Sequence, residues 1–225
     1  MRSEGDEICR QEHNEMASQI KDTARKQYRV IIFDLGNTLI RFDHGISAKK
    51  LAGLFNIDSE RIRSLFFDSD LTRSFEKGEI SPKVFYERVT ATLGIKIPFE
   101  GFVSIWNDIF WEDKESCDIA RQLKSRYRLL LLSNVNRLHY DYVEKKFDII
   151  KIFDGVILSF IAGAMKPERK IFEDAIRQAG CDKSEILYID DREDLIRCAA
   201  EFGIESIRFE DAKRLKEALE EKGII

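Results

Sequence analysis

Small polar side chains that could bind a cation or a phosphoryl group follow three apolar segments of this 225-residue sequence. They are Asp34 after residues 30–33, Ser133 and Asn134 after residues 129–132, and Asp190 and Asp191 after residues 186–189. Each residue type is also a favoured helix N-cap, so any one of them alone has an ordinary structural explanation. Asp190 and Asp191 are adjacent, and two negative charges at one turn cost free energy unless a cation lies nearby. Mg²⁺ is such a cation and is typically held by carboxylates and substrate phosphate oxygens. The set therefore predicts a Mg²⁺ site with Asp34 and Asp190 as ligands and Asp191 orienting a metal-bound water.

A lysine is expected to supply the positive charge of this group. Lys166 precedes Pro167, just ahead of a helical pattern that begins near residue 168, and this position favours a side chain at the same rim. The alternative is that Lys166 is one more solvated lysine, as most lysines are.

The elements that must position these residues are short buried strands that alternate with helices. Apolar runs without polar alternation, typical of parallel strands covered on both faces, occupy residues 30–33, 129–132, 156–158 and 186–189. A fifth strand is expected at residues 205–209, which precede Glu210 and Asp211. Helical patterns lie between and after them, at residues 115–125, 138–147, 168–179, 193–202 and 211–222. This alternation predicts an α/β fold with a doubly wound, Rossmann-type parallel sheet. Ligands of such sheets bind outside the carboxyl ends of the strands, where the polar residues fall.

One interval interrupts the alternation. Residues 45–112 contain no clear strand but four helical stretches, at 47–55, 59–67, 82–93 and 99–110. We therefore expect three parts: a polar extension over residues 1–28 that forms a frayed or loosely docked helix, a core domain of residues 29–44 and 113–225, and a helical cap domain over residues 45–112.

Composition narrows the classes of function. The net charge is −4, and 44% hydrophobic with 35% charged residues is typical of a soluble globular protein. Nucleic acid is not an expected partner because binding to its phosphates normally requires a basic patch. The apolar runs are too short for a bilayer, so no membrane partner is expected, and the charged N-terminus does not resemble a secretory signal. Four cysteines without CxxC spacing predict reduced thiols and a cytoplasmic protein.

Four segments resemble, in order and spacing, the motifs of the haloacid dehalogenase (HAD) superfamily. They are FDLGNTL at 33–39, LLSNVNRLH at 131–139, AMKPERKIF at 164–172 and LYIDDREDLIRCA at 187–199. The helical insertion resembles the superfamily's first class of cap. Its segment FEKGEIS at 75–81 resembles the branch that contains a bacterial α-glucose-1-phosphatase and the phosphatase domain of soluble epoxide hydrolase. The resemblance implies a Mg²⁺-dependent phosphatase for a small phosphorylated metabolite, with sugar phosphates among the candidates, and we expect a monomer or weak homodimer.

The resemblance also implies a role for each matching residue. Asp34 would be the nucleophile that forms an aspartyl-phosphate, which divides one displacement into two steps. The other implied roles are phosphoryl binding by Ser133 and the Asn134 backbone, charge neutralisation by Lys166, Mg²⁺ binding by Asp34, Asp190 and the Gly36 carbonyl, and support of the metal shell by Asp191. Arg137, just after the second motif, is a candidate contact to a substrate hydroxyl, the alternative being a solvated helix residue.

Gly36 departs from the family pattern, in which phosphatases usually have a second Asp that protonates the leaving oxygen and later activates water. Loss of a general acid/base typically costs roughly 10²–10⁴-fold in rate. We therefore expect a preference for good leaving groups, such as sugar 1-phosphates, aryl phosphates or acyl phosphates. His44 and Asp43 are candidate substitute donors. Leu195 is a smaller departure, because close relatives often have Asn at that position.

Two other functions fit parts of the sequence. Dehalogenases that act on 2-haloacids also lack the second Asp and need no metal, but Asp190 and Asp191 would repel an anionic haloacid. A non-catalytic binding or regulatory protein would explain Gly36, although it would not explain why Asp34, Ser133 and Lys166 are all present.

Overall fold

The computed structural model describes residues 27–67 and 69–225. The predicted N-terminal extension therefore lies outside the described residues, apart from its last two. Within the two described ranges, no helix has the length and apolar character needed to cross a membrane.

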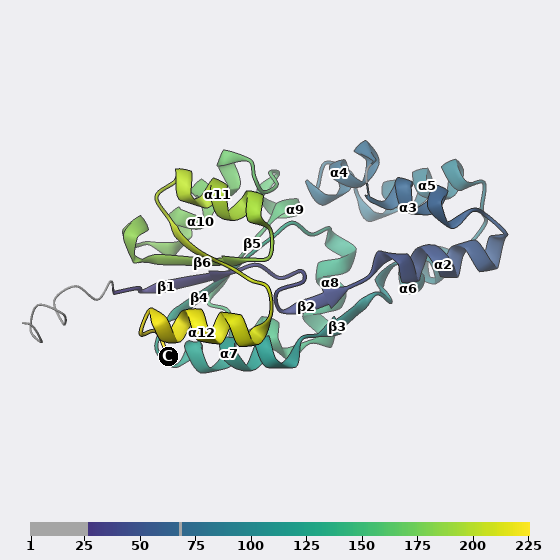
Figure 1. Ribbon diagram of the computed structural model, residues 1–225. Helices are drawn as coiled ribbons and strands as arrows, with labels where there is room; N and C mark the ends of the chain where they lie inside the picture. The colour runs from purple at the N-terminus through teal and green to yellow at the C-terminus, as the bar shows by residue number, and fades with distance from the viewer. Residues whose placement is uncertain (1–26, 68) are drawn as a thin grey trace, which may run out of the picture.

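A five-stranded parallel sheet forms the centre of the fold (Figure 1). Its strands are β1 (Val30–Phe33), β4 (Arg128–Ser133), β5 (Gly155–Leu158), β6 (Ile186–Asp190) and β7 (Glu205–Arg208), in the order β5-β4-β1-β6-β7. All four residues of β1 are buried, as the apolar run predicts for a central strand covered on both faces. The five strands coincide with the five predicted strands, and the predicted α/β doubly wound sheet is confirmed.

Helices cover both faces of this sheet (Figure 1). Helices α10 (Arg169–Ala179) and α11 (Glu193–Glu201) pack on one face, and α7 (Lys114–Lys124) and α12 (Ala212–Glu221) pack on the other. In α10 the apolar side chains recur at helical spacing and bury one stripe: Ile171, Phe172, Ala175 and Ala179. The remaining elements of this part are α8 (Arg137–Lys146), α9 (Ser159–Ala162) and the 3₁₀ turns η1 (Asp148–Ile152) and η2 (Lys183–Glu185).

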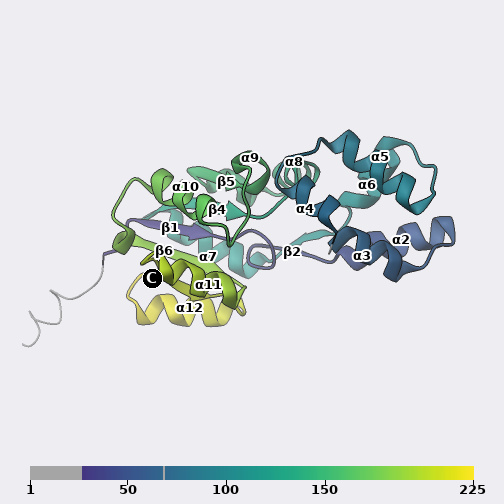
Figure 2. The ribbon, with the colours of Figure 1, turned by 90° about the horizontal axis from the view of Figure 1, so that it is seen from above.

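A second group of helices lies beyond the carboxyl ends of the strands (Figure 2). These are α2 (His44–Phe55), α3 (Ser59–Phe67), α4 (Asp70–Glu76), α5 (Pro82–Leu93) and α6 (Phe99–Asn107). They share a hydrophobic cluster of their own, in which Phe75, Phe85, Phe102 and Trp106 are fully buried. We propose that α2–α6 are the cap domain, and we use this name for them below.

The interval 45–112 differs from the prediction in two respects. Helix α4 was not predicted, because seven residues give too little periodicity to recognise. The interval also contains a strand, β3 (Phe110–Glu112), which pairs antiparallel with β2 (Ile40–Phe42) where the chain enters and leaves the cap. Three-residue strands whose partners lie 70 residues away in the chain leave no local pattern in the sequence.

Candidate active site

Three strands deliver polar residues to the edge of the sheet that faces the cap (Figure 2). Asp34 directly follows β1, while Ser133 and Asp190 are the last residues of β4 and β6. The register places Phe33 of β1 beside Leu131 of β4 and Ile189 of β6, so Asp34 is level with Asp190 and Ser133 lies one residue further along its strand. Asp34, Ser133, Asn134, Lys166, Asp190 and Asp191 all line one cavity of about 140 Å³.

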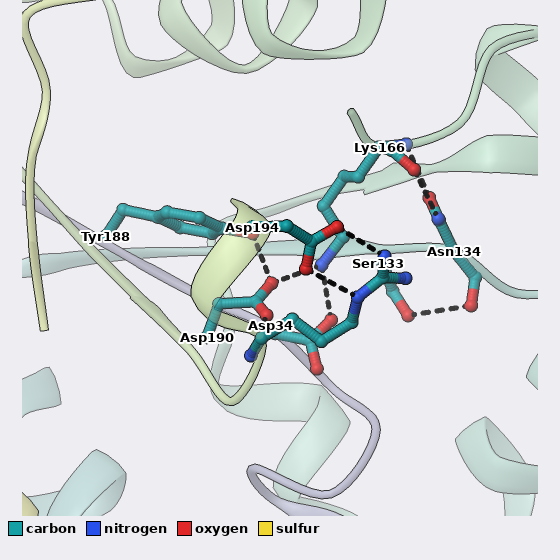
Figure 3. A network of polar contacts seen from close by, with 8 residues as sticks. Asp34, Ser133, Asn134, Lys166, Tyr188, Asp190 and Asp194 are labelled. Atoms are coloured by element: carbon teal, nitrogen blue, oxygen red, sulfur yellow. Dashed lines mark hydrogen bonds and ion pairs between the residues drawn. The ribbon is translucent and has the colours of Figure 1, made fainter. Parts of the chain in front are cut away.

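Lys166 lies at the centre of this group and is 4% exposed. Its Nζ donates to Asp34 Oδ1 at 2.6 Å and to Asp190 Oδ2 at 2.7 Å, and Figure 3 shows its side chain reaching between the two carboxylates. The Tyr188 hydroxyl also donates to Asp190 Oδ2, and the Arg192 backbone N–H donates to Asp190 Oδ1 at 2.9 Å. Asp190 is therefore held on both oxygens, whereas Asp34, which lines the cavity, accepts from Lys166 on Oδ1.

Burial determines the electrostatics of the site. It raises the pKa of Asp34 to about 7, although the neighbouring Lys166 ammonium opposes this shift. Burial alone would lower the pKa of Lys166, but Asp34, Tyr188 and Asp190 together hold it well above its usual range. The pKa of Asp191 is also raised, by burial and by the negative charge of Asp190. Three carboxylates thus share one ammonium, and the site favours a further positive charge.

The donor atoms fit a hard divalent cation. One carboxylate oxygen from each of Asp34, Asp190 and Asp191 lies within 4.8 Å of the other two. Carboxylate oxygens are the ligands that Mg²⁺ prefers in proteins. These three residues could therefore hold Mg²⁺.

The Asn134 side chain positions Lys166. Its Nδ2 donates to the Lys166 carbonyl oxygen at 2.9 Å, and its Oδ1 accepts from the Lys166 backbone N–H at 2.7 Å (Figure 3). This pair of bonds ties the loop after α9 to the end of β4. The Ser133 hydroxyl donates to the Asn134 carbonyl oxygen at 3.5 Å. Because the Asn134 amide is bound to Lys166, we propose that the Ser133 hydroxyl and the Asn134 backbone N–H are the groups that contact a ligand.

A family model for haloacid dehalogenase-like hydrolases matches residues 28–203. The chain belongs to this family. The predicted superfamily is thereby confirmed, and the chain is a HAD-like hydrolase.

Relatives of this HAD-like hydrolase include phosphatases. D-ribitol-5-phosphate phosphatase from Bacteroides thetaiotaomicron is 23% identical over 196 residues, which cover 84% of this chain and 95% of the relative. A sesquiterpene phosphatase from Aspergillus oryzae is 20% identical, over a match that covers 82% of this chain and 91% of the relative. Among solved structures, a HAD family enzyme from Bacteroides thetaiotaomicron in complex with magnesium and inorganic phosphate superposes with a TM-score of 0.75, at 26% identity, covering 82% of this chain and 95% of that one.

Arg137, a candidate contact to substrate, lines neither of the two cavities beside Asp34 in this hydrolase. It is exposed at the start of α8, where its Nε donates to Asp141 at 2.8 Å and its guanidinium lies over the Phe160 ring. Its place in the sequence is near the rim, but its side chain is paired with Asp141 of the same helix. The expected contact from Arg137 to a substrate hydroxyl is not supported.

Gly36, which would offer its carbonyl to the metal, lines the same cavity as Asp34. A Cβ at this position would lie 2.8 Å from Phe42 Cε1. Phe42 comes from β2, and its ring packs against His44 and Phe110. An aromatic ring therefore occupies the space that a side chain at position 36 would need.

Gly36→Asp alone is therefore expected to lower activity, because the new side chain must displace the Phe42 ring. The double variant Gly36→Asp/Phe42→Ala is expected to recover part of this loss and to act better on alkyl phosphates than Phe42→Ala does. Steady-state rates of the two single variants and the double variant test this expectation. A Gly36→Asp enzyme at least as fast as the wild type would show that Phe42 does not obstruct the position.

Asp43 and His44 are the two residues that the sequence suggested as substitutes for the missing acid. Asp43 is the N-cap of α2, and its Oδ1 accepts from the Gly45 backbone N–H at 2.7 Å. His44 lies among aromatic rings, with ring centroids 5.0 Å from Phe42 and 5.5 Å from His139. Burial lowers the pKa of His44 to about 4, so little of it is protonated at neutral pH. Neither residue is well suited to protonate a leaving group.

Proposed function

We propose that this HAD-like hydrolase is a Mg²⁺-dependent phosphatase that acts on small phosphate monoesters through an aspartyl-phosphate on Asp34. The observation that carries the proposal is the buried Lys166 ammonium between Asp34 and Asp190, with Asp191 beside them. The phosphatase activity named for two relatives supports it, as does the neighbour that binds magnesium and phosphate.

The residues of the chain suit an in-line displacement at phosphorus. An Asp34 oxygen attacks the phosphorus atom, and the bond from phosphorus to the leaving oxygen breaks. Lys166, within hydrogen-bond distance of Asp34 in the structure, holds that carboxylate in position and offsets charge on the phosphoryl group. The Ser133 hydroxyl and the Asn134 backbone bind phosphoryl oxygens. Asp34, Asp190, Asp191 and the Gly36 carbonyl would hold Mg²⁺, which would supply further charge neutralisation.

We propose a sugar or polyol phosphate as the substrate class. D-ribitol-5-phosphate phosphatase is a relative over most of both chains. A second cavity of about 70 Å³ adjoins the first, shares Gly36, Phe42, Ser133 and Asn134 with it, and extends toward the cap. The organic part of a phosphate ester bound at Asp34 would enter this cavity.

The test is phosphate release from p-nitrophenyl phosphate and a panel of sugar and polyol phosphates, with Mg²⁺ and with EDTA. We expect release that requires Mg²⁺ and is largest for members of the panel. Equal phosphate release with Mg²⁺ and with EDTA would contradict the proposed requirement for a metal. Mg²⁺ binding without any release would favour the non-catalytic binding protein, and halide release from a 2-haloacid would favour the dehalogenase.

The cap and the core approach each other closely at the backbone of Gly78. Gly78 has φ +72°, and a Cβ there would lie 2.1 Å from the Phe160 carbonyl oxygen of α9. Gly94 has a similar φ of +69°, but a Cβ there meets nothing within 4 Å. A substituted residue at either position would therefore carry the same backbone strain, but only at position 78 would it also clash with the core.

Gly78→Ala is expected to raise KM at least tenfold, because the end of α4 must move off α9. Gly94→Ala is the matched control: it should cost about 1–2 kcal/mol of stability for the left-handed backbone and leave KM unchanged. Steady-state kinetics and urea denaturation of both variants test this. Equal KM values in the two variants would show that the Gly78 contact has no part in substrate binding.

A further inference from the structure

One ionisable residue of the cap, a glutamate, lies at the smaller of the two cavities. Glu76 is the last residue of α4 and lines the smaller cavity together with Gly36, Ser133 and Asn134. The other three residues also line the cavity that contains Asp34. A group bound between Ser133 and Gly36 is therefore accessible to Asp34 from one side and to Glu76 from the other.

The backbone of Glu76 is fixed to the core. Ser159 Oγ donates to the Glu76 carbonyl oxygen at 2.6 Å and accepts from the Val135 backbone N–H at 2.9 Å. Val135 is two residues beyond Ser133, so one hydroxyl joins the end of α4 to the loop that would bind phosphate. The next residue of the cap, Lys77, is paired with Glu168 of the core at 2.8 Å. Contacts on both sides thus hold Glu76 at the cavity.

The Glu76 carboxyl has no hydrogen-bond or ion-pair partner within residues 27–67 and 69–225. Burial raises its pKa to about 7, although Arg73 on the same helix opposes this shift. The titratable groups on the facing wall are His44 and His139, whose pKa values burial lowers, so both are neutral near pH 7. A partly buried carboxyl without a partner, which is protonated in a large fraction near neutral pH, can both donate and accept a proton.

We propose that Glu76 is the general acid and base of the reaction, and that it acts from the cap in place of the carboxyl absent at Gly36. This inference rests on the proposed function. In the first step, an Asp34 oxygen bonds to phosphorus, the bond to the leaving oxygen breaks, and that oxygen takes the Glu76 proton and departs as an alcohol. In the second step, the Glu76 carboxylate takes a proton from water as the water oxygen attacks phosphorus. The bond between phosphorus and Asp34 breaks, which releases phosphate and restores protonated Glu76.

The proposal predicts that the effect of Glu76→Gln depends on the leaving group. For the best sugar or polyol phosphate of the panel, kcat/KM is expected to fall roughly 10²–10⁴-fold, since an alkoxide leaves poorly without a proton. For p-nitrophenyl phosphate, kcat/KM should change less than about threefold, because p-nitrophenolate needs no proton to leave. The second step still needs a base, so rapid mixing of p-nitrophenyl phosphate with Glu76→Gln should give a burst of p-nitrophenol followed by slow turnover.

Glu79→Gln is the matched control, because Glu79 is an exposed glutamate three residues away in the same segment, and it should match the wild type on both substrates. Glu76→Asp keeps a carboxyl group and should recover part of the activity lost in Glu76→Gln. Equal losses of kcat/KM on both substrates, or no loss on either, would overturn the role of Glu76. Activity of the wild type in the same assay shows separately whether the proposed phosphatase function holds.

Discussion

Replacement of Asp34 by Asn is expected to lower phosphate release by roughly 10⁴-fold or more, because an amide cannot form the covalent intermediate. Asn has nearly the same shape and can still accept from Lys166, so the cavity should be preserved. Rates on p-nitrophenyl phosphate with Mg²⁺, measured beside Asp118→Asn as a control on an exposed aspartate, test this expectation. Asp34→Asn with more than a tenth of the wild-type rate would exclude Asp34 as the nucleophile.

The same variant should change how stability depends on pH in the absence of metal. Burial raises the pKa of Asp34 in the folded protein from 3.8 to about 7. The folded state therefore binds a proton more tightly than the unfolded state, and this contribution to stability is lost as pH rises from about 4 to about 7. The amide introduced by Asp34→Asn does not titrate, so this variant should not show this loss of stability. Urea denaturation at pH 5 and pH 8 should show a smaller decrease for Asp34→Asn than for the wild type.

Lys166→Met is expected to have the second large effect, on both stability and activity. The substitution leaves Asp34 and Asp190 buried without their shared ammonium, and removal of one partner from a buried ion pair typically costs about 3–5 kcal/mol. Activity should fall by roughly 10²–10³-fold, as it does when one charge-stabilising donor is removed. Lys170→Met is the control, because Lys170 is an exposed lysine four residues further on.

The pH dependence of the Lys166→Met defect separates charge from packing. Without the ammonium, the folded-state pKa of Asp34 should rise further above its unfolded value, so the destabilisation should grow as pH rises and shrink at pH 5, where more of the carboxyl is protonated. Urea denaturation at pH 5 and pH 8 measures this difference. A defect of equal size at both values would mean that Lys166 acts mainly through its packing.

The sequence carries most of the information about the sheet and its polar edge. Apolar runs that end in Asp34, Ser133 and Asp190 identify three strands, and parallel pairing places their carboxyl ends together. The position of the Lys166 side chain is harder to predict, because nothing in its local sequence shows the loop that brings it between two carboxylates. The Asn134 amide, which binds the Lys166 backbone, is part of what fixes that loop.

Features that depend on contacts distant in the chain could not be predicted. The Phe42 ring approaches Gly36 because β2 pairs with β3, and neither strand has a recognisable pattern. Whether Arg137 faces the site depends on the rotation of α8 about its axis. Glu76 belongs to a segment recognisable as a turn with a left-handed glycine, but only the contact of Ser159 with its backbone places it at the cavity.

Mass spectrometry of the enzyme quenched in acid during turnover tests the central claim most directly. With Mg²⁺ and p-nitrophenyl phosphate, the account predicts that the wild type gains one phosphoryl group on the peptide that contains Asp34. Glu76→Gln should accumulate more of this species, and Asp34→Asn should show none. Phosphate release without any phosphorylated Asp34 peptide, or the same label in Asp34→Asn, would contradict the account.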